Sequence, residues 1–347
     1  MVVCNYNGAD YIEDCLNSIL PQAGVGEILV IDDASTDGSP ELIRRTFPTV
    51  RVIELSSNGG PCVARNLGLR AARHSHVLAV DNDTLLRPDV LEKLRAALEA
   101  DPAASISQVR SVLFDEPERV HYDGANFHFV GLLSLRNFYR PLAEAEGSGV
   151  IEAQALIGIC ALMDRDRVLA AGGYDEDFFY LAEDYELAYR LRLQGQRLLS
   201  VEDAIVLHRG GTEGLSFRGG GYPERRAYLH SINRWRILAK NYGTRTLLAI
   251  APGLLLYETV WLLFVIKQGH LLQHLRGKRD FFRAWPVLMR SRAAIQAKRR
   301  LPDRQLLVGG PLTFSPSLVE SGAARRCAAF LDFCLTAWWR LARPFCS

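Results

Sequence analysis

The sequence predicts an α/β protein with a largely parallel central sheet and helices on both faces, followed by a helical, basic C-terminal region. Short apolar segments alternate with amphipathic segments over the first hundred residues. Polar clusters follow three of the apolar segments and begin at Asn5, Asp32 and Asp81. In sheets of this kind ligands gather beyond the carboxyl ends of the strands, so we expect the three clusters to lie together.

The first eight elements follow from the spacing of apolar residues. Residues 10–20 place Ile12, Leu16 and Ile19 on one helical face, and Pro61 stands where a helix would begin. The predicted strands are 1–4, 27–31, 52–55 and 77–80, and the predicted helices are 10–20, 41–47, 61–72 and 88–100. The first strand begins abruptly at Met1, so we expect it to be truncated and the natural start to lie upstream.

The next hundred residues are less regular. The predicted strands are 106–113, 154–163, 198–201 and 204–207, and the predicted helices are 166–171 and 185–193, each closed by glycine. A glycine-rich stretch at 209–221 predicts a mobile loop, and from Glu224 onward the pattern is helical. We therefore divide the chain into an α/β domain at 1–222 and a helical, basic region at 223–347.

The two halves differ in charge although the whole chain carries only +2. Residues 1–220 hold 20 Lys or Arg against 33 Asp or Glu, a net charge of −13, whereas 221–347 hold 21 against 6, a net charge of +15. The basic half suits a phosphate-rich lipid surface or nucleic acid, and composition alone does not choose between them. The seven cysteines are scattered without a C-x-x-C pair, which favours neither a disulfide framework nor a zinc site.

Two carboxylates, Asp81 and Asp83, follow an apolar segment in a turn. Oxygen ligands of this kind suit Mg²⁺ or Mn²⁺ bridging a diphosphate. The alternative is that both are ordinary turn residues. Asp32 and Asp33 follow the second strand and offer acceptors to a nucleobase or ribose, and here the alternative is a pair of loop caps.

A flexible glycine loop ending at Gly60 precedes a helix that begins at Pro61. Glycine allows close approach of a ligand, and the helix N-terminus favours negative charge. Arg65, one turn into the helix, could face the same ligand. Glu183 and Asp184 lie at a helix start among aromatic residues, where desolvation favours the neutral form and suits a general base. The alternative is a pair of carboxylates that complement the helix dipole.

Seven segments occur in a recognisable order. They are Cys-Asn-Tyr-Asn at 4–7, Ile-Asp-Asp-Ala-Ser-Thr-Asp-Gly-Ser at 31–39, Asn-Gly-Gly at 58–60, Ala-Arg-Asn-Leu-Gly at 64–68, Asp-Asn-Asp at 81–83, Gly-Gly-Tyr-Asp-Glu-Asp-Phe-Phe at 172–179 and Ala-Glu-Asp-Tyr-Glu-Leu at 182–187. Together they resemble the family 2 glycosyltransferases of the GT-A fold, in their bacterial rhamnosyltransferase and cell-surface polysaccharide branch. The resemblance runs to about Arg209, and more loosely to about Leu307.

The resemblance implies a role for each cluster. Tyr6, Asn7, Asp32 and Asp33 would frame the nucleoside, and Asp81 would lie near the ribose and the metal. Asp83 would ligate Mg²⁺ or Mn²⁺, and His208 is similar to a histidine that some relatives place near the metal. A histidine that only ends a strand is the alternative for His208. Asp184, paired with Glu183, would be the catalytic base.

These roles imply an inverting transfer of a sugar from a dTDP- or UDP-sugar to a saccharide or polyprenyl-linked acceptor in cell-surface polysaccharide synthesis. Rhamnose from a thymidine diphosphate donor is one resemblance-based possibility. The chain lacks the Gln-x-x-Arg-Trp motif of processive synthases, which favours single additions. One alternative is a nucleotidyltransferase, which would open with a basic, glycine-rich phosphate loop that Asn5–Asp10 does not provide. The other is a non-catalytic membrane scaffold, against which the intact carboxylate pairs argue.

Residues 246–266 form the most apolar stretch of the chain. Their Leu, Ile, Val and Phe residues favour insertion by about 5 kcal/mol, and Glu258 opposes it by roughly 3 kcal/mol. Both flanks are basic, so a single crossing would violate the positive-inside tendency. We expect a re-entrant or in-plane segment on anionic headgroups at the cytoplasmic face of the cell membrane, with no nucleic acid as partner. The alternative is a soluble helix packed on the catalytic domain.

Overall fold

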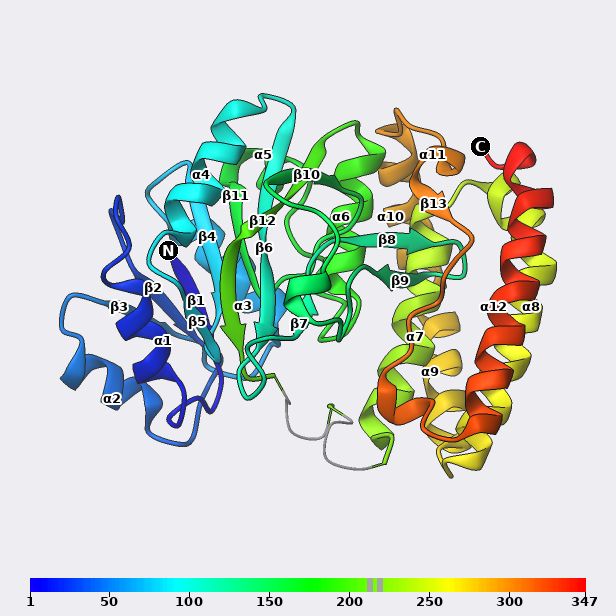
Figure 1. Ribbon diagram of the computed structural model, residues 1–347, viewed down its shortest axis with the longest axis horizontal. Coiled ribbons are helices and arrows are strands. Elements are labelled where there is room, and N and C mark those ends of the chain that lie inside the picture. The colour runs from blue at the N-terminus through cyan, green and yellow to red at the C-terminus, as the bar shows by residue number, and fades with distance from the viewer. Residues whose placement is uncertain (211–214, 217–220) are drawn as a thin grey trace. The chain divides into compact units, whose positions relative to one another are not determined.

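The computed structural model describes residues 1–210, 215–216 and 221–347 (Figure 1). The chain divides into two compact units. The first comprises 1–125, 136–191 and 196–210, and the second comprises 126–135, 192–195 and the remainder of the chain. Each unit has a hydrophobic core of its own. The division of the sequence at residue 222 stays a prediction.

The described part of the first unit contains a ten-stranded sheet in the order β10-β12-β6-β11-β4-β1-β2-β3, with β5 and β7 paired to β12 and β6. Its strands are β1 (Val2–Asn5), β2 (Leu29–Asp32), β3 (Arg51–Glu54), β4 (His76–Asp81), β5 (Thr84–Leu86), β6 (Ala104–Leu113), β7 (Val120–Tyr122), β10 (Val150–Ala153), β11 (Cys160–Asp164) and β12 (Arg197–His208). The four strands from β3 to β4 are parallel. Beyond β4 the sheet is mixed, because β11 runs antiparallel to both β4 and β6.

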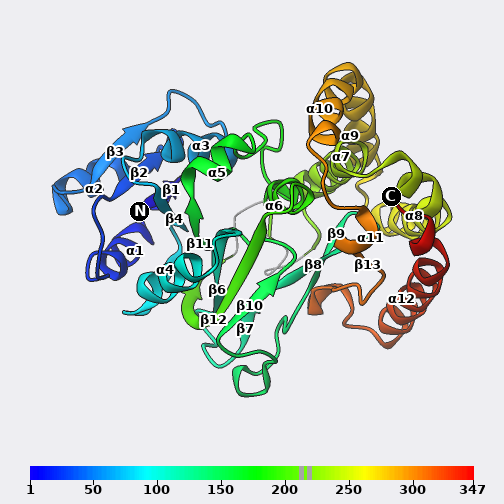
Figure 2. The same ribbon diagram turned by 90° about the horizontal axis from the view of Figure 1, so that it is seen from above.

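Helices cover both faces of this sheet (Figure 2). They are α1 (Ile12–Ile19), α2 (Ser39–Thr46), α3 (Pro61–Ala71), α4 (Val90–Ala100), α5 (Arg165–Ala170) and α6 (Glu183–Leu193). Apolar residues of α1, α2 and α4 share one core with the sheet. On the other face α3 lies so close that a Cβ at Gly68 would collide with Val2. The predicted α/β class with helices on both faces is confirmed. The sheet itself is mixed rather than mostly parallel, because its parallel pairings in the described part of the chain are limited to β1–β2, β1–β4, β2–β3 and β6–β12.

Two predicted segments differ from the structure. The strand expected at 154–163 begins only at Cys160, because Gln108 holds the preceding residues as a loop: its Nε2 donates to the Ala155 carbonyl (3.2 Å) and its Oε1 accepts from the Ile157 N–H (2.8 Å). The two strands expected at 198–207 are one strand, β12, whose register against β6 shifts between Val201 and Ile205. The mobile loop expected at 209–221 lies largely outside the described residues.

The second unit combines helices with a small sheet in the order β13-β8-β9. Its elements are β8 (Ala125–His128), β9 (Leu132–Leu135), α7 (Glu224–Asn241), α8 (Thr244–Lys267), α9 (Leu271–Arg283), α10 (Trp285–Ala297), α11 (Asp303–Leu306), β13 (Leu307–Val308) and α12 (Gly322–Ala342). The helical prediction for residues 223–347 therefore omitted one short strand, β13. Its partner β8 and the neighbouring β9 come from residues 125–135, far earlier in the sequence, and no local pattern indicates this pairing.

Candidate active site

The ends of β1, β2 and β4 are joined through Asn5. Its Nδ2 donates to Asp32 Oδ1 (2.7 Å) and to Ser39 Oγ (2.8 Å), and its Oδ1 accepts from Asn82 Nδ2 (2.9 Å). Asn5 is buried, so these bonds are not exchanged readily with water. The polar clusters that the sequence places after separate strands thus form one hydrogen-bonded group at one edge of the sheet.

Asp32 and Asp33 use their carboxylates to order loops. Asp32 accepts from the backbone N–H (2.9 Å) and the hydroxyl (2.6 Å) of Ser35. Asp33 accepts from the N–H groups of Gly59 (2.7 Å) and Gly60 (2.8 Å). Burial raises the pKa of Asp33, and the two N–H groups oppose that shift. Their contacts are those of loop caps, and a role in framing a nucleoside stays a prediction.

Tyr6 and Asn7 lie at the surface just beyond β1. The side chain of Tyr6 is 51% exposed. Asn7 has a left-handed backbone (φ 47°), donates its N–H to Ser35 Oγ (2.9 Å) and accepts from the Thr36 N–H (2.9 Å). Asn tolerates this conformation better than most residues. Asn7 therefore lies beside the Asp32 loop, and the role of Tyr6 and Asn7 in framing a nucleoside stays a prediction.

Gly60 permits a close approach between two loops of the site. It has φ 82°, and a Cβ there would collide with the carbonyl oxygen of Phe179. The segment that contains Phe179 ends in two non-glycine residues with positive φ, Leu181 (73°) and Ala182 (75°), directly before α6. Strained backbone of this kind persists where the surrounding structure imposes it, commonly at functional sites.

Arg65 is the electrostatic centre of the site. Its guanidinium, 5% exposed, contacts Asp81 Oδ1 (2.8 Å), Glu183 Oε1 (3.2 Å) and Asp184 Oδ1 (3.5 Å). Burial, together with the neighbouring Asp184, raises the pKa of Glu183 to about 7. Burial also raises the pKa of Asp184, against the opposing effect of Arg65. The desolvation expected at this carboxylate pair is present, while the expected contact of Arg65 with a ligand stays a prediction.

Replacing the buried cation should destabilise the first unit. We expect Arg65→Met to lower the free energy of unfolding by about 3–5 kcal/mol, because three carboxylates lose their buried partner. The measurement is urea-induced unfolding of the full chain. Arg70→Met on the same helix is the control: its ion pair with Glu176 is half exposed, so the change should stay below about 1 kcal/mol. Equal midpoints for the two variants would contradict this assignment.

Asp184 is oriented by a backbone group that the sequence does not indicate. Its Oδ2 accepts from the N–H of Gly158 (2.8 Å). A Cβ at Gly158 would overlap this carboxylate, so only glycine fits. Gly158 belongs to the loop that Gln108 holds through Ala155 and Ile157. Because the apolar residues of that loop resemble a strand in the sequence, the sequence did not indicate that Gly158 orients Asp184.

Asp81, Asp83 and His208 form the one group in the described part of the chain that could hold a metal ion, with ligand atoms within 4.8 Å of one another. Asp83 Oδ1 lies 3.4 Å from His208 Nε2, and its Oδ2 accepts from the Gly210 N–H (2.9 Å). Burial alone would raise the pKa of Asp83, but His208 and the N–H outweigh it and lower that pKa. Burial raises the pKa of Asp81, against Arg65. Two carboxylates and one imidazole fit Mg²⁺ or Mn²⁺.

His208 has a second partner, His121 of β7. The two Nδ1 atoms lie 2.9 Å apart and the rings stack at 4.9 Å between centroids. One nitrogen must donate and the other accept. If Nε2 of His208 is left free to ligate, its Nδ1 carries the hydrogen and His121 accepts it, which sets the tautomer of His208. Sequence reasoning missed His121 because 87 residues separate the pair.

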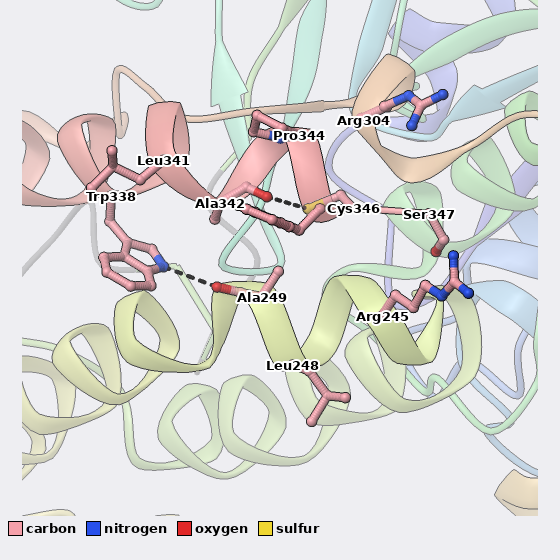
Figure 3. A pocket seen from close by; sticks show the side chains of 11 residues that line it. Arg245, Leu248, Ala249, Arg304, Trp338, Leu341, Ala342, Pro344, Cys346 and Ser347 are labelled. Atoms are coloured by element: carbon pink, nitrogen blue, oxygen red, sulfur yellow. Dashed lines mark hydrogen bonds between the residues drawn. The ribbon is translucent and has the colours of Figure 1, made fainter.

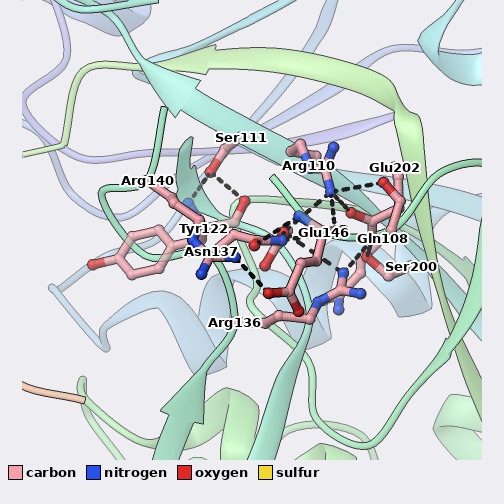
Figure 4. A network of polar contacts seen from close by, with 12 residues as sticks. Gln108, Arg110, Ser111, Tyr122, Arg136, Asn137, Arg140, Glu146, Ser200 and Glu202 are labelled. Atoms are coloured by element: carbon pink, nitrogen blue, oxygen red, sulfur yellow. Dashed lines mark hydrogen bonds and ion pairs between the residues drawn. The ribbon is translucent and has the colours of Figure 1, made fainter. Parts of the chain in front are cut away.

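A buried ion-pair network lies elsewhere in the first unit (Figure 4). Arg110 of β6 contacts Glu202 and lies 3.3 Å from Asp123, while Arg136 lies 2.5 Å from Glu202. Asn137 donates to Asp123 (2.6 Å). Burial raises the pKa of Asp123 to about 6. The network fastens the segment after β9 to the irregular part of β12, and it joins residues too far apart in sequence for any motif to indicate.

The first half of this chain is similar to known glycosyltransferases. Residues 1–168 match the model of Glycosyl transferase family 2, a range that ends before Asp184 and His208. The succinoglycan biosynthesis protein ExoO of Rhizobium meliloti (strain 1021) is 39% identical over 125 residues, covering 35% of this chain and 34% of that protein. The amylovoran biosynthesis glycosyltransferase AmsE of Erwinia amylovora is 22% identical over 220 residues, covering 62% of this chain and 77% of that protein.

Among solved structures, GalNAc-T7 with UDP, GalNAc and Mn²⁺ is similar to this chain with a TM-score of 0.57 and 17% identity, over 73% of this chain and 50% of that one. This likeness concerns the fold alone and confirms the predicted GT-A architecture. The chain matches about a third of the length of ExoO and 55% of a further relative from Bacillus subtilis.

Proposed function

We propose that this chain belongs to glycosyl transferase family 2, whose model residues 1–168 match, and that it transfers a sugar from a nucleotide-diphosphate donor to a saccharide or lipid-linked acceptor in cell-surface polysaccharide synthesis. One observation carries the proposal. The guanidinium of Arg65 contacts both Asp81, which belongs to the metal-type group, and Asp184, the candidate base. Donor activation and acceptor deprotonation would therefore occur side by side.

The proposed reaction is a single displacement that inverts the anomeric carbon. Asp184 takes the proton of an acceptor hydroxyl while that oxygen forms a bond to the anomeric carbon and the bond to the diphosphate breaks. The Gly158 N–H orients the Asp184 carboxylate. The raised pKa of Asp184 suits a proton acceptor. Asp81, Asp83 and His208 would hold Mg²⁺ or Mn²⁺. A divalent cation supplies charge that offsets the charge developing on the departing diphosphate.

The donor is proposed as a dTDP- or UDP-sugar. GalNAc-T7, whose structure is similar to this chain, is described with UDP, GalNAc and Mn²⁺. ExoO and AmsE are named for the biosynthesis of succinoglycan and of amylovoran. We propose the cytoplasmic face of the cell membrane as the location, because the second unit is basic and contains the most apolar segment.

A thermal-shift screen of nucleotide sugars with Mn²⁺ or Mg²⁺ tests this proposal. A ligand that binds only the folded state raises the melting temperature, by the equivalent of about 2.7 kcal/mol at a hundred times its Kd. We expect one dTDP- or UDP-sugar to stabilise the chain, and only with the metal. Stabilisation by none, together with no transfer from any donor, would favour a non-catalytic scaffold instead.

The contact between His121 and His208 makes a separate prediction. His121→Phe keeps a stacked ring but removes the acceptor, so we expect Mn²⁺ affinity to fall ~10- to 100-fold. Titration of Mn²⁺ followed by electron paramagnetic resonance measures it without turnover. Phe138→Leu, which alters another ring stacked on His121, is the control and should change affinity little. Unchanged Mn²⁺ affinity in His121→Phe would show that His121 does not position a metal ligand.

A further inference from the structure

Exposed apolar side chains gather in the second unit. Among the residues that the structure describes, fifteen of the nineteen exposed large hydrophobic side chains belong to it. The most exposed lie on α8, on α12 and just after α12: Leu248 (73%), Leu255 (69%), Leu263 (62%), Phe330 (68%), Phe333 (68%), Leu341 (66%) and Phe345 (71%). Exposed apolar side chains gathered on two neighbouring helices are typical of an interaction site.

α8 is predominantly apolar, but its packing leaves a row of apolar side chains exposed. Among the residues that the structure describes, it is the one helix long and apolar enough to cross a membrane. Its most apolar 18-residue stretch has a mean hydropathy of 1.9, yet only 22% of that stretch is buried. Ile250, Gly253 and Tyr257 form its packed face, whereas Leu255 and Leu263 point outward. A long apolar helix belongs in a protein core or in lipid. With only 22% of its most apolar stretch buried, α8 is not a core helix of the second unit.

Glu258, which made insertion of this segment marginal, is turned into the second unit. Its carboxylate contacts Arg234 of α7 and the indole N–H of Trp235, and lies 3.4 Å from Lys278 Nζ of α9. The acidic side chain is therefore paired with neighbouring helices rather than presented on the outer stripe. This arrangement removes the main obstacle to placing the outer face of α8 in an apolar medium.

α12 has the same two-faced character and packs beside α8 (Figure 1). Leu331, Leu335 and Trp339 are buried, while Phe330 and Phe333 are exposed on another side of the helix. The Nε1 of Trp338 donates to the Ala249 carbonyl of α8 (3.2 Å). A Cβ at Gly253 would lie 2.9 Å from the Trp338 ring, so glycine permits the close packing. The apolar surface thus extends over two helices.

Cations lie at the ends of this helix pair. At one end Arg245 and Arg304 line a hollow of about 780 Å³ whose other side is formed by Trp338 and Leu341 (Figure 3). At the other ends of the helices lie the exposed Lys267 of α8 and the exposed Arg325 and Arg326 of α12. An apolar stripe with cations at its margins is typical of helices that lie in the interface of an anionic bilayer.

We propose that the outer faces of α8 and α12 together form a docking surface for an anionic lipid bilayer, with both helices lying in the plane of its headgroup and acyl boundary. The net charge of +15 over residues 221–347 favours anionic lipid over an apolar protein partner of mixed charge. The proposal does not depend on sugar transfer, because bilayer binding is measured without donor or acceptor.

The test is sedimentation of the full chain with vesicles of phosphatidylcholine alone, or of phosphatidylcholine with about one-third phosphatidylglycerol. We expect stronger binding to the anionic vesicles. Leu255→Ser/Leu263→Ser/Phe330→Ser/Phe333→Ser should weaken that binding by at least ~10-fold. Leu20→Ser/Val150→Ser, which alters exposed apolar residues of the first unit, should leave it unchanged.

Two double substitutions test the contributions of α12 and of the cations at one end of the helix pair separately. Phe330→Ser/Phe333→Ser alone should weaken binding several-fold, and an unchanged affinity would remove α12 from the surface. Arg245→Gln/Arg304→Gln should reduce the preference for anionic vesicles while retaining binding to neutral ones. The proposal is overturned if the unaltered chain binds neither vesicle, if the fourfold variant binds as well as the unaltered chain, or if light scattering shows that the surface joins two copies of the chain instead.

Discussion

Asp184→Asn should lower the rate of sugar transfer by at least ~10²-fold while the Kd for the donor changes little. The amide has nearly the shape of the carboxylate and can still accept from the N–H of Gly158. It cannot take the proton of an acceptor hydroxyl, so the loss should appear in kcat. Initial rates with a saccharide acceptor give kcat, and calorimetric titration gives the donor Kd.

Two further variants sharpen this test. Asp166→Asn replaces an exposed carboxylate of α5 and should leave both quantities unchanged. Glu183→Gln separates the paired carboxylates: a larger loss of kcat there than in Asp184→Asn would assign the base to Glu183. Collapse of donor binding in Asp184→Asn would instead make Asp184 a structural or substrate-positioning residue.

Asp83→Ala should abolish metal-dependent donor binding and reduce transfer by on the order of 10²-fold or more, with the fold intact. The variant removes one of three candidate ligands together with the contact to His208. The thermal shift produced by donor and Mn²⁺ measures binding. The difference between the shifts with and without EDTA gives the contribution of the metal. Asp89→Ala, which removes an exposed carboxylate beside Lys93, is the control. Activity that persists in EDTA, or in Asp83→Ala, is incompatible with this metal site.

The sheet from β3 to β4 was predictable because its signals are local. β1, β2 and β4 are short apolar runs that end in polar turn residues, and Pro61 marks the start of α3. The small sheet of the second unit carries no such signal. Its strand β13 has only two residues, and Leu307 of β13 pairs with Phe127 of β8, which lies 307 − 127 = 180 residues earlier in the sequence. The loop before β11 has the apolar sequence of a strand. Only the structure shows that the side-chain amide of Gln108 holds it as a loop through hydrogen bonds to its backbone.

The candidate site divides in the same way. Asp81, Asp83 and the Glu183–Asp184 pair were found because carboxylates at strand or helix ends stand out in the sequence. The sequence did not indicate how these carboxylates are arranged relative to one another. Their arrangement depends on the buried guanidinium of Arg65 and on packing between segments that are distant in the sequence. The same holds for Gly158 and His121, whose roles come only from the residue each one touches.

Product analysis tests the central claim most directly. The full chain is incubated with Mn²⁺, a panel of dTDP- and UDP-sugars and saccharide acceptors, and both the released nucleoside diphosphate and the glycosylated product are identified. We expect one donor to give both, with the new linkage inverted at the anomeric carbon, and initial rates of product formation at least ~10²-fold lower from Asp83→Ala and from Asp184→Asn. A product of retained configuration, or equal yields from the unaltered chain and the two variants, would contradict the proposed site and mechanism.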